Sequence, residues 1–207
     1  SFSMKLRTDF TRIRQFWLTA ISIPDMQYNF RTANENDAPA ISELLHSAMI
    51  TYCANSGVCA SMLEAMTEDI AAVTDRIRTS HCFCYFSGNR AVATITLSEL
   101  TTPLKLSFSD KTEHYLSQFS KVGYISRFAV SEDLRNEGLG IDLISRTTAF
   151  AREHGLEAVL LHSAVSNRTM VEFYCNRGFV LIDHENSRGY PRGLFSYRLC
   201  KDNVTAG

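Results

Sequence analysis

The residues best able to do chemistry in this 207-residue chain lie in one run, residues 128–140, with the sequence FAVSEDLRNEGLG. The run predicts a strand and a short loop that lead into an amphipathic helix. The first N–H groups of a helix have no partner within it, and the helix dipole favours negative charge there, so this position suits a phosphate. Gly138 and Gly140 lack the Cβ atoms that would keep a pyrophosphate away, and Arg135 can add a charge-assisted hydrogen bond. The alternative is that the two glycines only form a tight turn.

A second run completes a pattern. The glycines of the first run follow neither the GxGxxG order of dinucleotide sites nor the GK[ST] order of nucleoside-triphosphate sites. The order Arg-x-x-Gly-x-Gly resembles instead the pyrophosphate loop of the GNAT superfamily of N-acetyltransferases, which bind acetyl-CoA. The family's Asn-x-x-(small or apolar)-x-x-x-Tyr-x-x-x-Gly-Phe pattern is reproduced by Asn167, Met170, Tyr174, Gly178 and Phe179. The resemblance extends from about Met26 to Leu199.

The resemblance implies a fold and a cofactor site. The fold is α/β (α+β), a single domain with a GNAT-type mixed, mostly antiparallel central β-sheet flanked by helices. In this family the strand at 128–130 pairs with the pantetheine arm of acetyl-CoA, the loop cradles the pyrophosphate, and the next strand, here 157–162, diverges to leave a V-shaped gap. Asn167 is implied to contact the cofactor or to hold the start of its helix. The implied cofactor-binding residues are Phe128, Ala129, Val130, Arg135, Asn136, Glu137, Gly138, Leu139, Gly140, Asn167 and Tyr174.

Tyr174 is also an implied catalytic residue, because its hydroxyl would reach the thioester sulfur. As an amine attacks, the departing thiolate needs a proton or a hydrogen bond, which a phenol with a pKa near 10 can supply. The alternative is a half-buried aromatic side chain that packs with Phe173 and Phe179. We expect direct transfer, because neighbouring helix residues diverge by about 100° and Cys175 cannot easily face the same thioester as Tyr174.

Two departures from the family pattern bear on the loop and on the base. Asn136 stands where glycine is usual, and Glu137 stands where a basic residue is common; Glu137 can point its carboxylate to solvent while its N–H faces phosphate. Many family members have a glutamate on the strand where this chain has Tyr124, and a phenol is a poor base near neutral pH. The candidate catalytic bases are therefore Glu99 and His162. Each also has an ordinary interpretation, a surface acid for Glu99 and a buried structural histidine for His162.

Arg127 leaves an alternative function open. A Ser-Arg-Phe run on this strand also occurs in the related acyl-homoserine-lactone synthases, which use an acyl carrier protein as donor. That family needs a carboxylate where Tyr124 stands and an N-terminal region that Trp17 with Arg12 and Arg14 imitates only loosely. The structural alternative is that Arg127 faces a helix and pairs with an acid. A third interpretation is a CoA-binding regulatory module that has lost catalysis.

The expected acceptor is a small-molecule amine or a protein amino group. The segment 100–121 and the loop 183–193, which carries both charges and an aromatic residue, are expected to set specificity. The second segment has a simpler interpretation as a solvated connection.

Patterning along the chain predicts the elements that position these residues. Strand-like alternation is found at 28–32, 82–86, 91–97, 124–130, 157–162, 179–183 and 194–199. Helical spacing predicts a helix that starts within 36–39 and ends at 55–57, and others at 138–154 and 166–177. A further helix is predicted to open near Thr67, with Ile70, Val73 and Ile77 on its inner face. The stretch 101–121 is polar and carries no predicted element.

Composition and charge argue against several other classes of protein. With 21 Lys plus Arg against 22 Asp plus Glu and 45% hydrophobic residues, the chain is an ordinary globular protein whose core needs no metal or disulfide. A net charge of −1 gives no global field for nucleic acid or an anionic membrane. No apolar run approaches the roughly 20 residues of a membrane span, and no secretory signal is evident. We expect all six cysteines to be reduced thiols of a cytoplasmic protein without a metal site.

The first 25 residues differ from the rest. Residues 1–3 precede Met4 like a scar of expression cloning, and Phe10, Ile13 and Trp17 have helical spacing. We expect an N-terminal extension at 1–25 and the N-acetyltransferase domain at 26–207, with Met26 as a plausible natural start. Whether the extension mediates a homodimer stays open.

Overall fold

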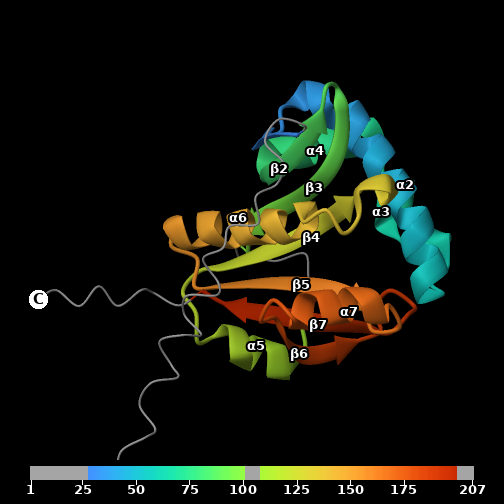
Figure 1. Ribbon diagram of the computed structural model, residues 1–207. Coiled ribbons are helices and arrows are strands. Elements are labelled where there is room, and N and C mark those ends of the chain that lie inside the picture. The colour runs from blue at the N-terminus through green and yellow to red at the C-terminus, as the bar shows by residue number, and fades with distance from the viewer. Residues whose placement is uncertain (1–27, 101–107, 200–207) are drawn as a thin grey trace, which may run out of the picture.

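The computed structural model describes residues 28–100 and 108–199, which form one seven-stranded sheet with helices on both faces (Figure 1). Neighbouring strands are antiparallel except β4 and β5, which are parallel. The mixed, mostly antiparallel sheet matches the predicted fold class. In spatial order the strands are β1 (Asn29–Thr32), β2 (His81–Ser87), β3 (Arg90–Glu99), β4 (Val122–Val130), β5 (Ala158–Ala164), β7 (Arg192–Arg198) and β6 (Val180–Glu185).

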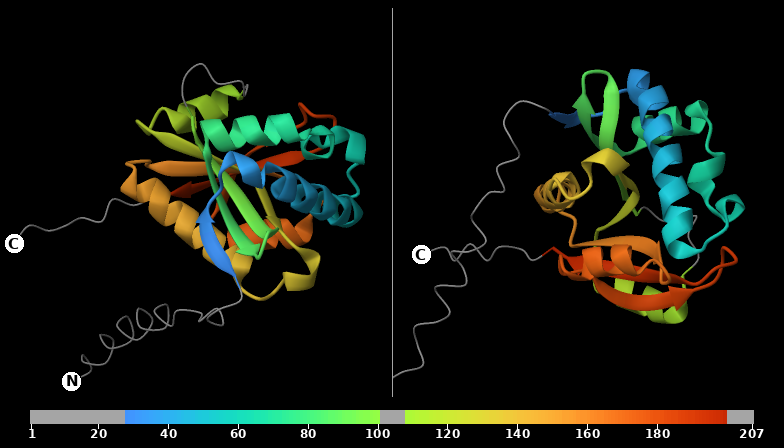
Figure 2. Two further views of the ribbon diagram at one scale, coloured as in Figure 1. Left: turned by 90° about the horizontal axis from the view of Figure 1, so that it is seen from above. Right: turned by 45° about the vertical axis from the view of Figure 1, so that its right-hand side comes forward.

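Alternation along the strands divides the core between the two faces of the sheet. In β2, Phe83 and Tyr85 join the core under one set of helices, whereas Cys82, Cys84 and Phe86 join the core on the opposite face. The first face is covered by α6 (Leu139–Glu153) and α7 (Arg168–Cys175). The second is covered by α2 (Ala38–Ser56), α4 (Ile70–Thr79) and α5 (Asp110–Leu116). Both layers are visible in Figure 2.

Short elements connect these layers. They are η1 (Glu35–Asp37), η2 (Ala60–Met62), α3 (Glu64–Thr67) and η3 (Glu132–Leu134). The first long helix, α2, starts with a proline in its first turn and ends at Gly57, whose φ of 69° is the left-handed conformation that glycine adopts at little cost. Both ends were predicted from these residues.

Two of the sequence predictions need correction. Helix α4 starts at Ile70 with Asp69 as its cap, because the Asp69 carboxylate accepts the Ala72 N–H; Thr67 instead ends the separate turn α3. Ile70 is 51% exposed and does not belong to the inner face, whereas Val73 and Ile77 are buried. The polar stretch 101–121 contains α5, which Ser109 caps by accepting the Thr112 N–H.

The two central strands separate midway along their length. β4 and β5 pair only from Val122 to Tyr124, and each strand then continues without the other. On its other side, β4 carries a bulge against β3, where Arg127 has a positive φ of 50°. The predicted V-shaped gap between the two strands is therefore present, and Figure 1 shows it between the upper and lower parts of the sheet.

Several expectations fall on residues outside those described. The N-terminal extension at 1–25, Met26, Trp17 and Cys200 all belong to this group. None of the helices within 28–100 and 108–199 combines the length and apolar character that crossing a bilayer requires. The cysteines in these ranges, Cys53, Cys59, Cys82, Cys84 and Cys175, are all free thiols.

Candidate active site

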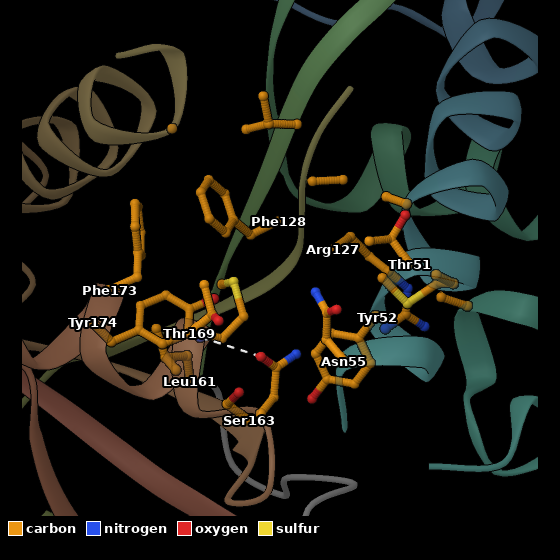
Figure 3. Close-up of a pocket in the computed structure, with 18 of the residues that line it drawn as sticks. Thr51, Tyr52, Asn55, Arg127, Phe128, Leu161, Ser163, Thr169, Phe173 and Tyr174 are labelled. Atoms are coloured by element: carbon orange, nitrogen blue, oxygen red, sulfur yellow. Dashed lines mark hydrogen bonds between the residues drawn. The ribbon is translucent and has the colours of Figure 1, made fainter. Parts of the chain in front are cut away.

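A cleft of about 660 Å³ occupies the gap between β4 and β5. Its walls come from β4, the start of α6, β5, α7, α2 and the loop between β6 and β7. Figure 3 shows Phe128, Phe173 and Tyr174 gathered on one side, with Arg127 and Thr51 on the other. The cleft therefore joins the face of the sheet under α6 and α7 to the face under α2.

At the α6 end, the loop predicted to hold a pyrophosphate has its donors free. Among the described residues, the N–H groups of positions 136–141 donate to no other group, because Asp142 is the first residue of α6 to bond backward, to the Gly138 carbonyl. Arg135 lines the same part of the cleft and has no ion-pair partner in the described ranges. This is the arrangement of helix N-terminus and cation that binds an anion.

Backbone geometry accounts for the residues of this loop. Asn136 and Gly138 have φ values of 69° and 89°, and asparagine tolerates the left-handed region better than most other residues that carry a Cβ. A Cβ on Gly140 would lie 3.1 Å from Cζ of Phe128, so the close approach of α6 to β4 favours glycine, and a larger residue would push the Phe128 ring aside. Glu137 is exposed, and its carboxylate accepts the Tyr28 hydroxyl at 3.2 Å. The departures at Asn136 and Glu137 therefore leave the loop open.

Side chains of the implied cofactor set take different positions. Phe128, Ala129 and Val130 line the cleft along β4. Leu139 is buried in the core and does not line the cleft, so only its N–H can face a ligand. Asn167 is buried and caps α7, because its side-chain oxygen accepts the Met170 N–H at 3.3 Å. The hydrogen bond supports the second of the two roles foreseen for Asn167, holding the helix start; Asn167 also lines the cleft, and contact with the cofactor stays a prediction.

Tyr174 lines the cleft from α7. It is 5% exposed, and its ring contacts Phe128, Phe173 and Phe179. Within the described residues its hydroxyl has no hydrogen-bond partner, and burial raises its pKa, so the hydroxyl stays protonated at neutral pH. Tyr174 thus packs as an aromatic core residue and also presents a proton to the cleft.

On the opposite face, the structure joins two residues that the sequence suggested only separately. The Tyr124 hydroxyl and Nδ1 of His162 share a hydrogen bond of 2.9 Å, and Nε2 of His162 lies 3.6 Å from a carboxylate oxygen of Glu185. Burial lowers the pKa of His162 to about 4, with Arg192 adding to the effect, so the imidazole is neutral near pH 7. In the tautomer with hydrogen on Nε2, Nδ1 accepts from Tyr124 while Nε2 faces Glu185.

Other candidates lie elsewhere. Glu99 is paired with Gly123 across β3 and β4, lies 3.6 Å from Lys121 and does not line the cleft. Cys175 is exposed and does not line the cleft either. Arg127 pairs with Glu68 and, at 3.5 Å, with Glu64, as the structural interpretation of this arginine predicted.

Comparison with known proteins identifies the family to which the chain belongs. The model of the Acetyltransferase (GNAT) family matches residues 42–179, which contain the loop, Tyr124, His162 and Tyr174. The chain belongs to the GNAT acetyltransferase family. A search of curated protein sequences finds no match.

Solved structures share the fold of this GNAT acetyltransferase at low sequence identity. They include Ard1 from Thermoplasma volcanium (17% identity, TM-score 0.60) and a probable acetyltransferase from Staphylococcus epidermidis (18%, 0.59). Another is the PaiA N-acetyltransferase from Thermoplasma acidophilum in complex with coenzyme A (12%, 0.63). Each alignment covers 84% of this chain and 99% of the other. These structures support the fold, and membership of the GNAT family makes the chain an N-acetyltransferase that uses acetyl-CoA.

The residues present fit that donor. The free N–H groups at 136–141 suit a pyrophosphate. Beyond Tyr124, β4 stays paired with β3 but has no partner on the β5 side, which leaves room for an extended arm along 128–130. The sequence reasoning missed Tyr52, Glu185 and Arg192 as parts of the site. Glu185 and Arg192 are paired across β6 and β7, and both fall in the 183–193 segment, whose charges were the available signal.

Proposed function

We propose that this enzyme transfers the acetyl group of acetyl-CoA directly to a primary amine. The observation that carries the proposal is one continuous cleft. At one end lies the loop 135–140, called here the phosphate-type loop, with free N–H groups, and at the other lies the Tyr124–His162 pair. No cysteine lines the cleft in the described part of the chain, which favours direct transfer over a covalent acyl-enzyme. The domain proposed at 26–207 includes every residue of this cleft.

Acetyl-CoA supplies the acetyl group as a thioester, and the chain supplies the proton transfers. The amine nitrogen forms a bond to the acetyl carbon, and the carbon–sulfur bond breaks. The proton lost by the amine passes through the Tyr124 hydroxyl to Nδ1 of His162, and Glu185 stabilises the imidazolium that results. Tyr174 donates a proton at the sulfur, because its phenol is buried and protonated. Glu99 has no part in the proposal, since its carboxylate lies outside the cleft.

Thermal unfolding with acetyl-CoA, with CoA and with a long-chain acyl-CoA tests the donor. A ligand present at 100 times its dissociation constant adds about 2.7 kcal/mol to the free energy of unfolding. We expect stabilisation by acetyl-CoA and CoA, followed by thiol release when an amine is added. Stabilisation only by the long-chain thioester would favour the lactone-synthase-like alternative, and binding without thiol release for any amine would favour a regulatory module.

A further inference from the structure

The end of the cleft remote from the phosphate-type loop is rich in arginine. We define this acceptor end by six residues that line it: Tyr52, Tyr124, Arg127, His162, Arg188 and Arg192. They come from α2, β4, β5, the β6–β7 loop and the start of β7. Of the charged side chains lining this end, three are arginines and one, Glu64, is acidic.

The carboxylates that balance these arginines lie largely behind them. Arg127 is held by Glu68 through Nε and Nη2, and Arg192 is held by Glu185, yet neither Glu68 nor Glu185 lines the cleft. Both arginines are mostly buried, with side chains 20% and 10% exposed. Holding a buried guanidinium from behind fixes its position and leaves its front available.

Each of these two guanidiniums keeps a donor for a ligand. Among the described residues, the hydrogen bonds and ion pairs of Arg127 leave from Nε and Nη2, and those of Arg192 leave from Nη2. Nη1 of each arginine is therefore free of such partners within the described ranges, and both arginines line the cleft. Arg188 and Glu64 form an ion pair between the β6–β7 loop and α3, and this pair joins two walls of the cleft.

The charge at this end bears on the acceptor. Burial raises the pKa of Tyr124 to about 12, while Arg192, Arg127 and Arg188 all act to lower it and the Glu185 carboxylate acts to raise it. Three arginines and one carboxylate thus act directly on the Tyr124 hydroxyl, while Glu64 and Glu68 pair with Arg127 and Arg188. A polyamine or a lysine side chain would bring more positive charge into this environment. An ammonium compound that also carries a carboxylate would have no net charge.

We propose that the acceptor is a free amino acid, whose carboxylate is bound by Arg127 and Arg192 and whose amino group faces the Tyr124–His162 pair. Planar guanidinium groups match a carboxylate well, and hydrogen bonds between such charged groups are roughly twice as strong as neutral ones. A carboxylate fits better than a phosphate, because Glu64, Glu68 and Glu185 already pair with the three arginines and little net charge is left to balance a dianion. The Arg188–Glu64 ion pair joins two walls of the site, which favours a small molecule over a protein chain.

This inference rests on the proposed function, and a binding experiment separates the two. The enzyme saturated with CoA is titrated with each of the common amino acids and with the matched amine that lacks the carboxylate, such as leucine against isoamylamine, with thermal unfolding and calorimetry as readouts. We expect at least one amino acid to bind the CoA complex about tenfold or more tightly than its matched amine. Failure of CoA itself to stabilise the protein contradicts the proposed function, a result that the first step of the experiment detects.

Variants of the chain sharpen the test. Arg192→Gln is expected to weaken amino-acid binding about tenfold while CoA still stabilises the protein. Arg188→Gln, in the loop, is a milder change for the case in which Arg192→Gln fails to fold, and it should weaken amino-acid binding in the same direction. Arg198→Gln is the matched control, because Arg198 lies on the same strand, contacts Gln118 and does not line the cleft.

The following outcomes overturn the inference. One is a matched amine, a polyamine or a lysine peptide that binds or is acetylated as well as every amino acid. Another is the absence of amino-acid binding to an enzyme that does bind CoA. A third is equal amino-acid affinity in Arg192→Gln, Arg188→Gln and the wild type. An aminophosphonate that binds more tightly than the corresponding amino acid also contradicts the choice of a carboxylate.

Discussion

Replacing Tyr174 by phenylalanine removes one hydroxyl and tests the catalytic acid directly. Since the hydroxyl has no hydrogen-bond partner among the described residues, its loss leaves no buried group unpaired, and we expect the free energy of unfolding to change by about 1 kcal/mol or less. The ring keeps its contacts with Phe128, Phe173 and Phe179. Loss of a general acid slows turnover by about 10² to 10⁴, which corresponds to about 2.7–5.4 kcal/mol in the activation barrier.

The assay follows thiol release at saturating acetyl-CoA and acceptor, with CoA binding measured in parallel by thermal unfolding. We expect kcat to fall in Tyr174→Phe while the CoA-induced stabilisation stays as in the wild type. Tyr115→Phe is the control: the Tyr115 hydroxyl donates to Ser196 at 2.9 Å outside the cleft, so this variant should lose stability and keep its turnover. Equal kcat values for Tyr174→Phe and the wild type would refute the acid role and leave Tyr174 as a packing residue.

Three further predictions concern the loop and the histidine. Gly140→Val should abolish the CoA-induced stabilisation of about 2.7 kcal/mol at 100 times the dissociation constant, because a Cβ there would lie 3.1 Å from Cζ of Phe128. Gly88→Ala has open space but a φ of 58°, so it should lose stability in thermal unfolding and keep the response to CoA. Asn136→Val should cost about 1–3 kcal/mol of stability in denaturant titration because φ is 69°, whereas Asn136→Gly should cost none, and equal losses would contradict the backbone argument. The pKa of His162 is lowered from 6.5 to about 4, so the unfolded chain binds its proton first and stability should fall as the pH drops from 6.5 towards 4; His162→Gln should flatten that part of a plot of Tm against pH.

The fold was predictable where the sequence signal was local. Strand alternation and the glycine at the end of α2 gave elements close to those observed, because both depend on neighbouring residues. The start of α4 was misplaced because Thr67 and Asp69 are both good caps, and the choice depends on α3, which uses Thr67. Helix α5 is not predicted although Ser109 is a good cap, because the polar composition of the stretch 101–121 favours no regular element.

The loop end of the site could be predicted from the sequence, whereas the pairing of Tyr124 with His162 at the other end could not. The loop end follows one continuous run of residues, so its pattern could be recognised. The pair of Tyr124 and His162 depends on the register of two parallel strands, in which Tyr124 lies beside Leu160 and His162 follows two residues later on the same face. The partner Glu185 comes from a third strand, and only the β6–β7 pairing brings it next to Arg192. Spacing along the chain cannot give such cross-strand contacts.

The tyrosine at position 124 and the arginines around it are two parts of one arrangement. A glutamate at this position would stand near Arg127, Arg188 and Arg192, and these guanidiniums would hold it as an ion pair and weaken it as a base. With a neutral phenol in its place, the same cations act on the acceptor. These cations favour the neutral amine of the acceptor over its ammonium form. A neutral amine has one proton fewer for the weakly basic His162 to accept. A carboxylate on the acceptor then offsets the repulsion that a simple ammonium would meet, which connects the missing glutamate to the amino-acid acceptor.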